Sequence, residues 1–274
     1  AHAWTPWFAI FGSKSGFDTI EECFGDLAKN IFAVETGLSS DPPMNWKNSQ
    51  LDSLALISNS DAHSLQGLGR EANIFEGEKI SYDLLFDAIK NSSISARAAK
   101  TNKSPLQLIK TIEFYPDEGR YHFDGHANCK IALHPREAIK IKNICPVCGK
   151  PLTLGVLHRV EELADRKEAE IPKNRPGFIY SVELEKIIAE AVGVRGRRSK
   201  AVERHYWDLI NKFGGELALL LDADDKELGR AVPSNIAEAI RRVRGQKLKI
   251  SPGYDGAYGV IKIFKDDEVI EGRK

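Results

Sequence analysis

No apolar run in this sequence approaches the roughly 20 residues that a helix needs to cross a bilayer. No charged-then-apolar leader opens it, so we expect an intracellular, cytoplasmic protein with no membrane partner. An excess of one charge is missing too, because Lys+Arg and Asp+Glu both number 39. That balance argues against a nucleic-acid binder that relies on total charge alone, although a neutral sum can hide a basic face.

Cysteine is scarce, and its distribution is uneven. The chain has 4 cysteines, of which Cys129, Cys145 and Cys148 lie close together while Cys23 is distant. Such clustering favours a metal site over paired disulfides and is typical of a reducing compartment. We expect Cys23 to be a buried structural thiol.

Two short motifs predict a structural zinc site. His126 and Cys129 form an H-x2-C pair, and Cys145 and Cys148 form a C-x2-C knuckle. Two residues between ligands let one tight turn direct both at a single ion, and thiolates with an imidazole complete a closed tetrahedral site. The choice of histidine is open, since His122 and His134 lie nearby.

The composition changes twice along the chain and predicts three regions. An α/β region over 1–110 contains apolar runs at 31–35 and 54–58, which we predict to be buried parallel strands, and a helix over 81–89. A zinc-binding module follows over 111–172. The region 173–274 is predicted to be mainly helical, with helices over 181–192, 199–213 and 234–243 and a terminal hairpin over 247–264.

Polar residues follow the predicted strands of the first region. Asp61 and His63 come shortly after the strand at 54–58, Glu35 ends the strand at 31–35, and His2 opens an aromatic segment. Nitrogen and oxygen ligands at strand ends suit Zn, Mg or Mn and hydrolytic chemistry. The alternative interpretation of the D-x-H pair is a hydrogen-bonded turn.

These segments resemble the later motifs of the polymerase-and-histidinol-phosphatase (PHP) phosphoesterases. The resemblance is closer to archaeal endonuclease Q, it covers essentially the whole chain, and it rests on residues 1–6, 35–42, 58–64, 145–153 and 157–165. It implies an α/β fold that is the C-terminal part of a distorted PHP-type barrel, followed by the zinc module and a helical region. It also implies that His2, Asp61 and His63 bind catalytic metal and that Glu35 lies near the site.

The opening H-x-H motif and the middle metal ligands of that family are absent from this sequence. We therefore expect either that this sequence is truncated, or that the N-terminal remainder of the PHP domain is a separate polypeptide and a partner of this chain. We also expect the chain by itself to be catalytically inactive.

The resemblance implies a DNA repair endonuclease that cleaves the phosphodiester bond 5′ to a deaminated base, such as hypoxanthine or uracil, or to an abasic site. Asp61 and His63 would hold metal that activates water, and Glu35 could orient that water. Two alternatives stay open: a PHP-type phosphatase of a small phosphorylated metabolite, and a non-catalytic DNA-binding fragment.

Candidate DNA contacts lie in two parts of the chain. Near the predicted metal site they are Trp4, Ser13, Lys14 and Arg70, whereas the neighbours Trp7 and Phe8 could equally be packing residues. In the last region they are Arg195, Arg197, Arg198, Lys200 and Tyr254, and a second basic cluster lies over 241–249. A basic stretch can also be a merely solvated helix face. A sliding clamp is a further candidate partner.

Overall fold

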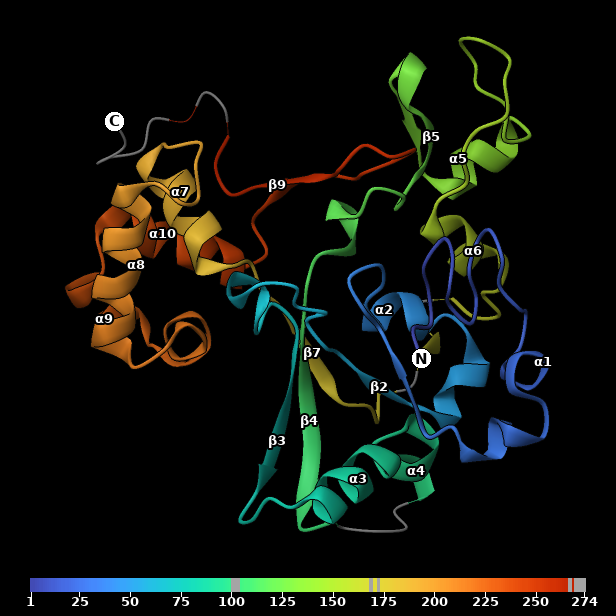
Figure 1. The fold of residues 1–274 in the computed structure, drawn as a ribbon, viewed down its shortest axis with the longest axis horizontal. Coiled ribbons are helices and arrows are strands. Elements are labelled where there is room, and N and C mark those ends of the chain that lie inside the picture. Colours follow the sequence, from blue (N-terminus) through green and yellow to red (C-terminus); the bar gives the residue numbers. More distant parts are fainter. Residues whose placement is uncertain (100–103, 168–169, 172, 266–267, 269–274) are drawn as a thin grey trace. The chain divides into compact units, whose positions relative to one another are not determined.

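The computed structural model describes residues 1–99, 104–167, 170–171, 173–265 and 268. It divides into two compact units: the first contains residues 1–179 and 251–260, and the second contains residues 180–250 and 261–274. The described residues form a mixed α/β fold without a closed barrel (Figure 1). Among them, no helix combines the length and the apolar character that a membrane crossing requires.

A small parallel sheet in the first unit confirms the two predicted strands. β1 (Ala33–Glu35) pairs with β2 (Ala55–Ile57), and Glu35 lies level with Ile57 at the carboxyl end of both strands. The chain start runs beside β1, since the amide of Ala3 donates to the carbonyl of Glu35. α1 (Ile20–Phe24) begins with a capping box formed by Thr19 and Glu22, and α2 (Pro42–Asn45) is capped by Asp41.

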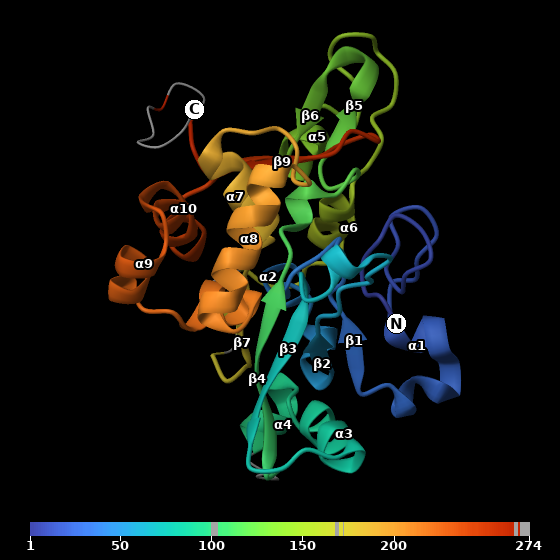
Figure 2. The same cartoon turned by 60° about the vertical axis from the view of Figure 1, so that its left-hand side comes forward.

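A second sheet has the strand order β3-β4-β7. β3 (Ala72–Gly77) runs antiparallel to β4 (Leu106–Glu113), and β7 (Gly177–Tyr180) forms the other edge. Figure 2 shows α3 (Tyr82–Lys90) and α4 (Ile94–Ala99) at one end of the β3–β4 pair. The Ser81 hydroxyl accepts the amide of Leu84 and starts α3, as its sequence predicts.

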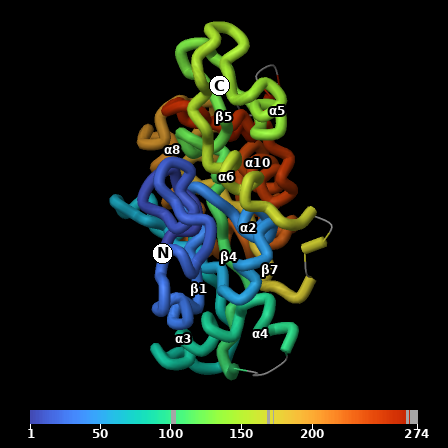
Figure 3. The backbone as a smooth tube through the Cα atoms, turned by 90° about the vertical axis from the view of Figure 1, so that its right-hand side faces the viewer, coloured from blue at the N-terminus to red at the C-terminus, as the bar shows by residue number. Residues whose placement is uncertain are grey.

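The cysteine-rich segment folds within the first unit. It consists of β5 (Asp124–His126) paired antiparallel with β6 (Ile131–Leu133), followed by α5 (Pro135–Lys140) and α6 (Val156–Glu162) (Figure 3). The predicted helical stretch of this region, near 160–170, thus ends earlier than expected.

One hydrophobic core joins α6 to the N-terminal α/β elements. Its members come from the first segment (Trp4, Phe11), from β1 (Val34) and from α6 (Val156, Val160), and all are buried. Ion pairs reinforce the contact, because Arg166 holds both carboxylate oxygens of Asp52 at 2.8 and 3.2 Å. Residues 156–166 are therefore an integral part of the first unit.

The second unit confirms the three predicted helices, and a fourth, which was not predicted, lies in the acidic segment between the last two. α7 (Leu184–Val192), α8 (Lys200–Phe213), α9 (Asp225–Ala231) and α10 (Ser234–Arg244) pack through buried apolar faces. A π-helical turn covers 218–222, and the Arg244 guanidinium donates to three backbone carbonyls of 219–223. The guanidinium thereby satisfies acceptors at the end of that turn.

The predicted terminal hairpin is present as β8 (Lys249–Ser251) and β9 (Val260–Lys262). The glycine-rich loop between these strands belongs to the first unit. Amides of Gly253 and Gly259 donate to carbonyls of Asp117 and Glu118. A Cβ at Gly259 would lie only 1.9 Å from the Asp117 carbonyl oxygen, so this approach requires glycine.

Candidate functional site

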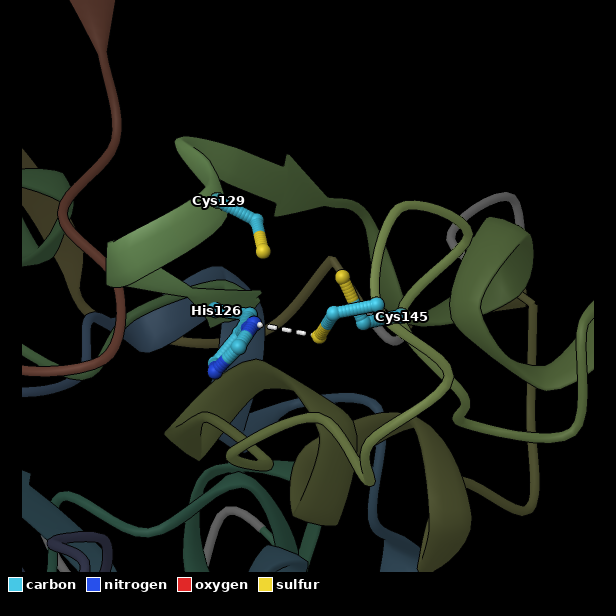
Figure 4. Close-up of side chains that lie close together, drawn as sticks. His126, Cys129 and Cys145 are labelled. Carbon is cyan, nitrogen blue, oxygen red and sulfur yellow. Dashed lines mark hydrogen bonds between the residues drawn. The ribbon is translucent and has the colours of Figure 1, made fainter.

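Four side chains converge in the cysteine-rich module. His126 ends β5, Cys129 ends the 3₁₀ turn that follows, and Cys145 and Cys148 flank the knuckle turn. The ligand atoms of all four lie within 4.8 Å of one another, and Cys148 Sγ is 3.3 Å from His126 Nδ1. Figure 4 shows His126, Cys129 and Cys145 directed at a common point. This donor set could hold a metal ion such as zinc.

The surroundings of the cysteines shift the pKa values of their thiols, which decide whether a thiolate can bind a cation. Burial opposes ionisation of Cys145, but the amides of Cys148 and Val147 and the His126 imidazole lower the pKa of its thiol to about 6. Burial and the neighbouring thiols raise the pKa of Cys129 to about 11. One thiolate therefore forms readily, and a bound cation would favour ionisation of the others.

The choice of histidine, open from the sequence, is settled by position. His134 lies at the start of α5, where its ring nitrogen accepts the amide of Arg136. His122 is buried elsewhere, with Nε2 3.7 Å from Asp117, and burial lowers its pKa to about 4. His126 is the histidine that joins the cysteine cluster.

Two of the predicted strand-end residues meet beside β1. Nδ1 of His2 lies 3.2 Å from Oε2 of Glu35 but makes no hydrogen bond among the described residues. Gly37, at φ +62°, allows this arrangement, since a Cβ there would lie 2.8 Å from His2 Nδ1. An imidazole nitrogen without a hydrogen bond beside a carboxylate is a donor pair that fits a divalent cation.

The D-x-H pair lies in the loop that follows β2. Asp61 adopts a left-handed conformation, with φ +45°, and its carbonyl accepts from Nδ1 of His63 at 2.8 Å. Both side chains are exposed. Arg70 fixes this loop by donating to the carbonyls of Ser60 and Asp61 at 2.8 and 3.2 Å.

These four residues form two pairs at the carboxyl edge of one parallel sheet. Among the residues that the structure describes, three or more possible ligands gather only in the cysteine cluster. The hydrogen bond from His63 to the Asp61 carbonyl also forms the turn that was the alternative interpretation of this pair. As it stands, the edge offers donors for a cation, and a complete coordination shell would need further ligands.

Two buried glutamates near this edge were not predicted. Glu113 ends β4, and its carboxylate accepts from the Thr36 hydroxyl, just after β1, at 3.0 Å. Burial raises the pKa of Glu113 to about 8, and burial with the charge of Glu113 raises that of Glu71 to about 9. Their local sequences carry no signal, because the two residues meet only through the pairing of β3 with β4.

Trp4 is the one predicted DNA contact that the structure contradicts outright. Its indole is fully buried, packs against the tilted Phe11 ring with 4.8 Å between ring centroids, and donates to Asn45 Oδ1 at 2.8 Å. An aromatic ring with no exposed surface cannot stack on a base, so Trp4 is a core residue.

The other predicted DNA contacts in the first unit differ in accessibility. The Lys14 side chain is exposed, whereas the Ser13 hydroxyl is buried without a hydrogen bond among the described residues. Tyr254 packs against Gly125, where a Cβ would lie 2.4 Å from its ring. Tyr258, which was not predicted, is the exposed tyrosine of the same loop.

In the second unit, Arg195, Arg197, Arg198 and Lys200 are exposed around the turn between α7 and α8. Arg197 reaches Glu183 at 3.4 Å. In the second basic cluster, two arginines form ion pairs within the unit: Arg242 pairs with Glu238, and Arg241 pairs with Asp225. The turn before α8 is therefore the freer cationic surface of this unit.

Comparison with known proteins gives matches along nearly the whole chain. Residues 183–247, which span α7 to α10, match the family described as the MJ0043 C-terminal domain. The chain is 36% identical over 271 residues to the uncharacterized protein MJ0043 of Methanocaldococcus jannaschii, covering 98% of this chain and 32% of that protein. It is 31% identical over 263 residues to the uncharacterized protein YqxK of Bacillus subtilis, covering 96% and 60%.

Two solved structures of endonuclease Q, described for Pyrococcus furiosus as a lesion-specific endonuclease, resemble this fold. They are endonuclease Q of Pyrococcus furiosus, with a TM-score of 0.82, and endonuclease Q in complex with a 27-mer duplex carrying an abasic lesion, with a TM-score of 0.78. Both are 31% identical to this chain and cover 99% of it, while the chain spans 64% and 65% of theirs. The resemblance to endonuclease Q over essentially the whole chain is thereby confirmed.

Proposed function

We propose that this chain is part of a DNA repair endonuclease that cuts the phosphodiester bond 5′ to a damaged nucleotide, either a deaminated base (hypoxanthine or uracil) or an abasic site. The observation that carries the proposal is the similarity to endonuclease Q along 99% of the chain at 31% identity. One of those structures holds duplex DNA with an abasic lesion at its active site. DNA containing such lesions is the substrate we infer for this chain.

The cleavage site in this proposal is the carboxyl edge of β1 and β2. His2, Asp61 and His63 would hold Zn, Mg or Mn, which when bound neutralises phosphate charge and lowers the pKa of coordinated water. Glu35, whose Oε2 lies 3.2 Å from Nδ1 of His2, would orient the attacking water or accept a proton from it. The edge would be the C-terminal part of a PHP-type barrel, whose remaining strands would supply the further ligands.

The remaining charges fit a DNA role. Lys14, on the segment that follows His2, and the four cations around the turn between α7 and α8 offer contacts for backbone phosphates, each within its own unit. Zinc at His126 and the three cysteines would be structural, because four protein ligands leave no open coordination position.

Nicking of end-labelled duplexes tests the proposal. The chain is joined to a polypeptide with the early PHP motifs, supplied with Mn or Mg, and given duplexes with a single hypoxanthine, uracil or abasic site. We expect one product ending 5′ of the lesion, its loss in Asp61→Ala, and its retention in the matched surface variant Asp87→Ala.

Cutting without regard to the lesion, or equal activity of Asp61→Ala, would contradict the proposal. Hydrolysis of a plain phosphomonoester without any DNA nicking would favour a metabolite phosphatase instead. The chain without the early motifs is expected to give no product under the same conditions.

A further inference from the structure

Exposed aromatic side chains gather on the first unit from two distant parts of the sequence. Phe8 is 96% exposed and Trp7 43%, both a few residues after His2, and Tyr258 in the glycine-rich loop is 71% exposed. Single exposed aromatics are ordinary, but a contiguous group of them marks an interaction site. Three in one region point to a binding surface.

Residues 120 and 121 connect the two groups. The Trp7 ring meets the Tyr121 ring edge-on at 5.4 Å, and the Arg120 guanidinium lies over the Tyr258 ring at 4.9 Å. The sequence of contacts therefore runs from Trp7 through Tyr121 and Arg120 to Tyr258. We call Trp7, Phe8, Arg120, Tyr121 and Tyr258 the aromatic platform.

Hydrogen bonds to the backbone hold the loops at both ends of the platform. Phe8 sits in a left-handed conformation, with φ +59°, in a loop whose neighbours Ile10 and Lys14 donate backbone hydrogen bonds to His2 and Pro6. At the other end, Arg120 Nε donates to the Gly256 carbonyl at 2.9 Å. A non-glycine residue with positive φ and a fully exposed side chain is unusual away from functional sites.

The platform adjoins the two chain segments that carry His2 and Glu35 of the proposed cleavage edge. Arg120 and Tyr121 of the platform line a small cavity together with Pro6, Ser39 and His122. Pro6 follows His2 on the first segment, and Ser39 follows Glu35 on the loop after β1. Asp117 is turned inward toward His122, and Asp255 accepts the amide of Ala127, whereas Arg120 is exposed and adds a positive charge to this surface.

We propose that the aromatic platform binds unpaired nucleotides of a DNA strand by stacking. Bases of every kind offer a π-face, and alternating aromatic rings with an arginine are the arrangement that holds single strands without reading their sequence. The inference rests on the proposed function and deepens it, because a nucleotide beside the cleavage edge must leave its helix before it can reach the rings.

Fluorescence anisotropy with the 274-residue chain tests the platform. The probes are a labelled oligothymidine strand, which cannot pair with itself, and an intact duplex of the same length, at one fixed salt concentration. Loss of one stacked base corresponds to about a 5- to 150-fold weaker Kd. We expect Phe8→Ala and Tyr258→Ala each to weaken single-strand binding in this range, with a smaller effect on the duplex.

Tyr82→Ala is the matched control, since Tyr82 is 80% exposed on α3 of the same unit. It should leave both affinities unchanged, and Tyr258→Trp should retain single-strand binding. The inference is overturned if the alanine variants bind the strand as the parent chain does, or if strand and duplex lose affinity equally. It is also overturned if the parent chain does not bind the strand.

Cleavage plays no part in this measurement, so it separates the two proposals. If the platform variants lose strand binding but the chain joined to the early motifs never nicks lesion DNA, the proposed function is wrong and the platform proposal stands. If lesion DNA is nicked but the alanine variants bind the strand as the parent does, the platform proposal is wrong and the proposed function stands.

Discussion

Replacement of Asp124 by Asn should weaken the first unit in a pH-dependent way. Asp124 is fully buried, and its two carboxylate oxygens accept from different donors. One accepts the amide of Gly155, which caps α6, at 2.8 Å, and the other accepts Nδ1 of His158 at 2.6 Å. Asn has only one acceptor oxygen, so Asp124→Asn leaves one of these donors facing an NH₂ group.

The size of the effect follows from the protonation of His158. Its hydrogen bond to Asp124 raises the pKa of His158, so the stabilisation is complete below the unfolded pKa and is lost as pH rises through the folded pKa. A buried hydrogen bond to a charged group contributes about 1.5 to 3 kcal/mol. In the Asp124→Asn variant, neutral His158 can accept from the new side-chain amide through its other tautomer, whereas the imidazolium cannot.

We therefore expect Asp124→Asn to cost about 3 kcal/mol of unfolding free energy near pH 5.5 and about 1 kcal/mol near pH 8.5. Urea unfolding followed by tryptophan fluorescence measures this, with zinc held in excess. Trp207→Phe in every protein removes the signal of the second unit and leaves Trp4, Trp7 and Trp46 as reporters.

Asp87→Asn is the control, because Asp87 is exposed on α3 in the same unit. It removes the same charge without a buried partner and should cost little at either pH. An equal loss for Asp124→Asn at both pH values, or a loss no larger than that of Asp87→Asn, would refute the role assigned to the His158 pair.

Three further outcomes are expected. Cys145→Ser should lose tightly bound zinc, measured by metal analysis after dialysis, while Cys23→Ser should retain it; retention by both would remove Cys145 from the site. The stability of the parent chain should fall between about pH 4.5 and about pH 8, because Glu113 keeps its proton in the folded state and loses it in the unfolded state; Glu113→Gln should reduce that fall. Urea midpoints of the variant that fall with pH as steeply as those of the parent would contradict the raised pKa of Glu113. Gly37→Ala should lower unfolding free energy by about 1 to 2 kcal/mol and displace His2, visible as an altered imidazole resonance, whereas Gly214→Ala should strain only the end of α8.

The parts of the structure that the sequence predicted well are local in the chain. The C-x2-C and H-x2-C pairs place ligands within one turn each, and Ser81 caps α3 through an amide three residues away. Spacing determines such geometry, so sequence alone could identify the cysteine cluster and the helices of the second unit.

The parts that the sequence could not predict depend on distant pairing. Tyr258 reaches Arg120 only because the glycine-rich loop docks on residues 117–127, and Glu71 approaches Glu113 only through the β3–β4 pair. The prediction that Trp4 contacts DNA was wrong for a related reason. Its position after His2 favoured a role in the site, but the parallel pairing of residues 1–3 with β1 directs the indole into the core.

The same docking explains how a structural metal could influence a surface that it does not touch. Asp255 of the glycine-rich loop accepts the amide of Ala127, the residue after His126, at 2.6 Å. Arg120 and Gly256 exchange hydrogen bonds on the neighbouring stretch of the same contact. A metal that fixes His126 and Cys129 would thus also fix the position of Asp255, and with it the loop that carries Tyr258. The cysteine cluster is in this sense the support of the aromatic platform, while the metal edge at His2 and Glu35 depends on a different sheet.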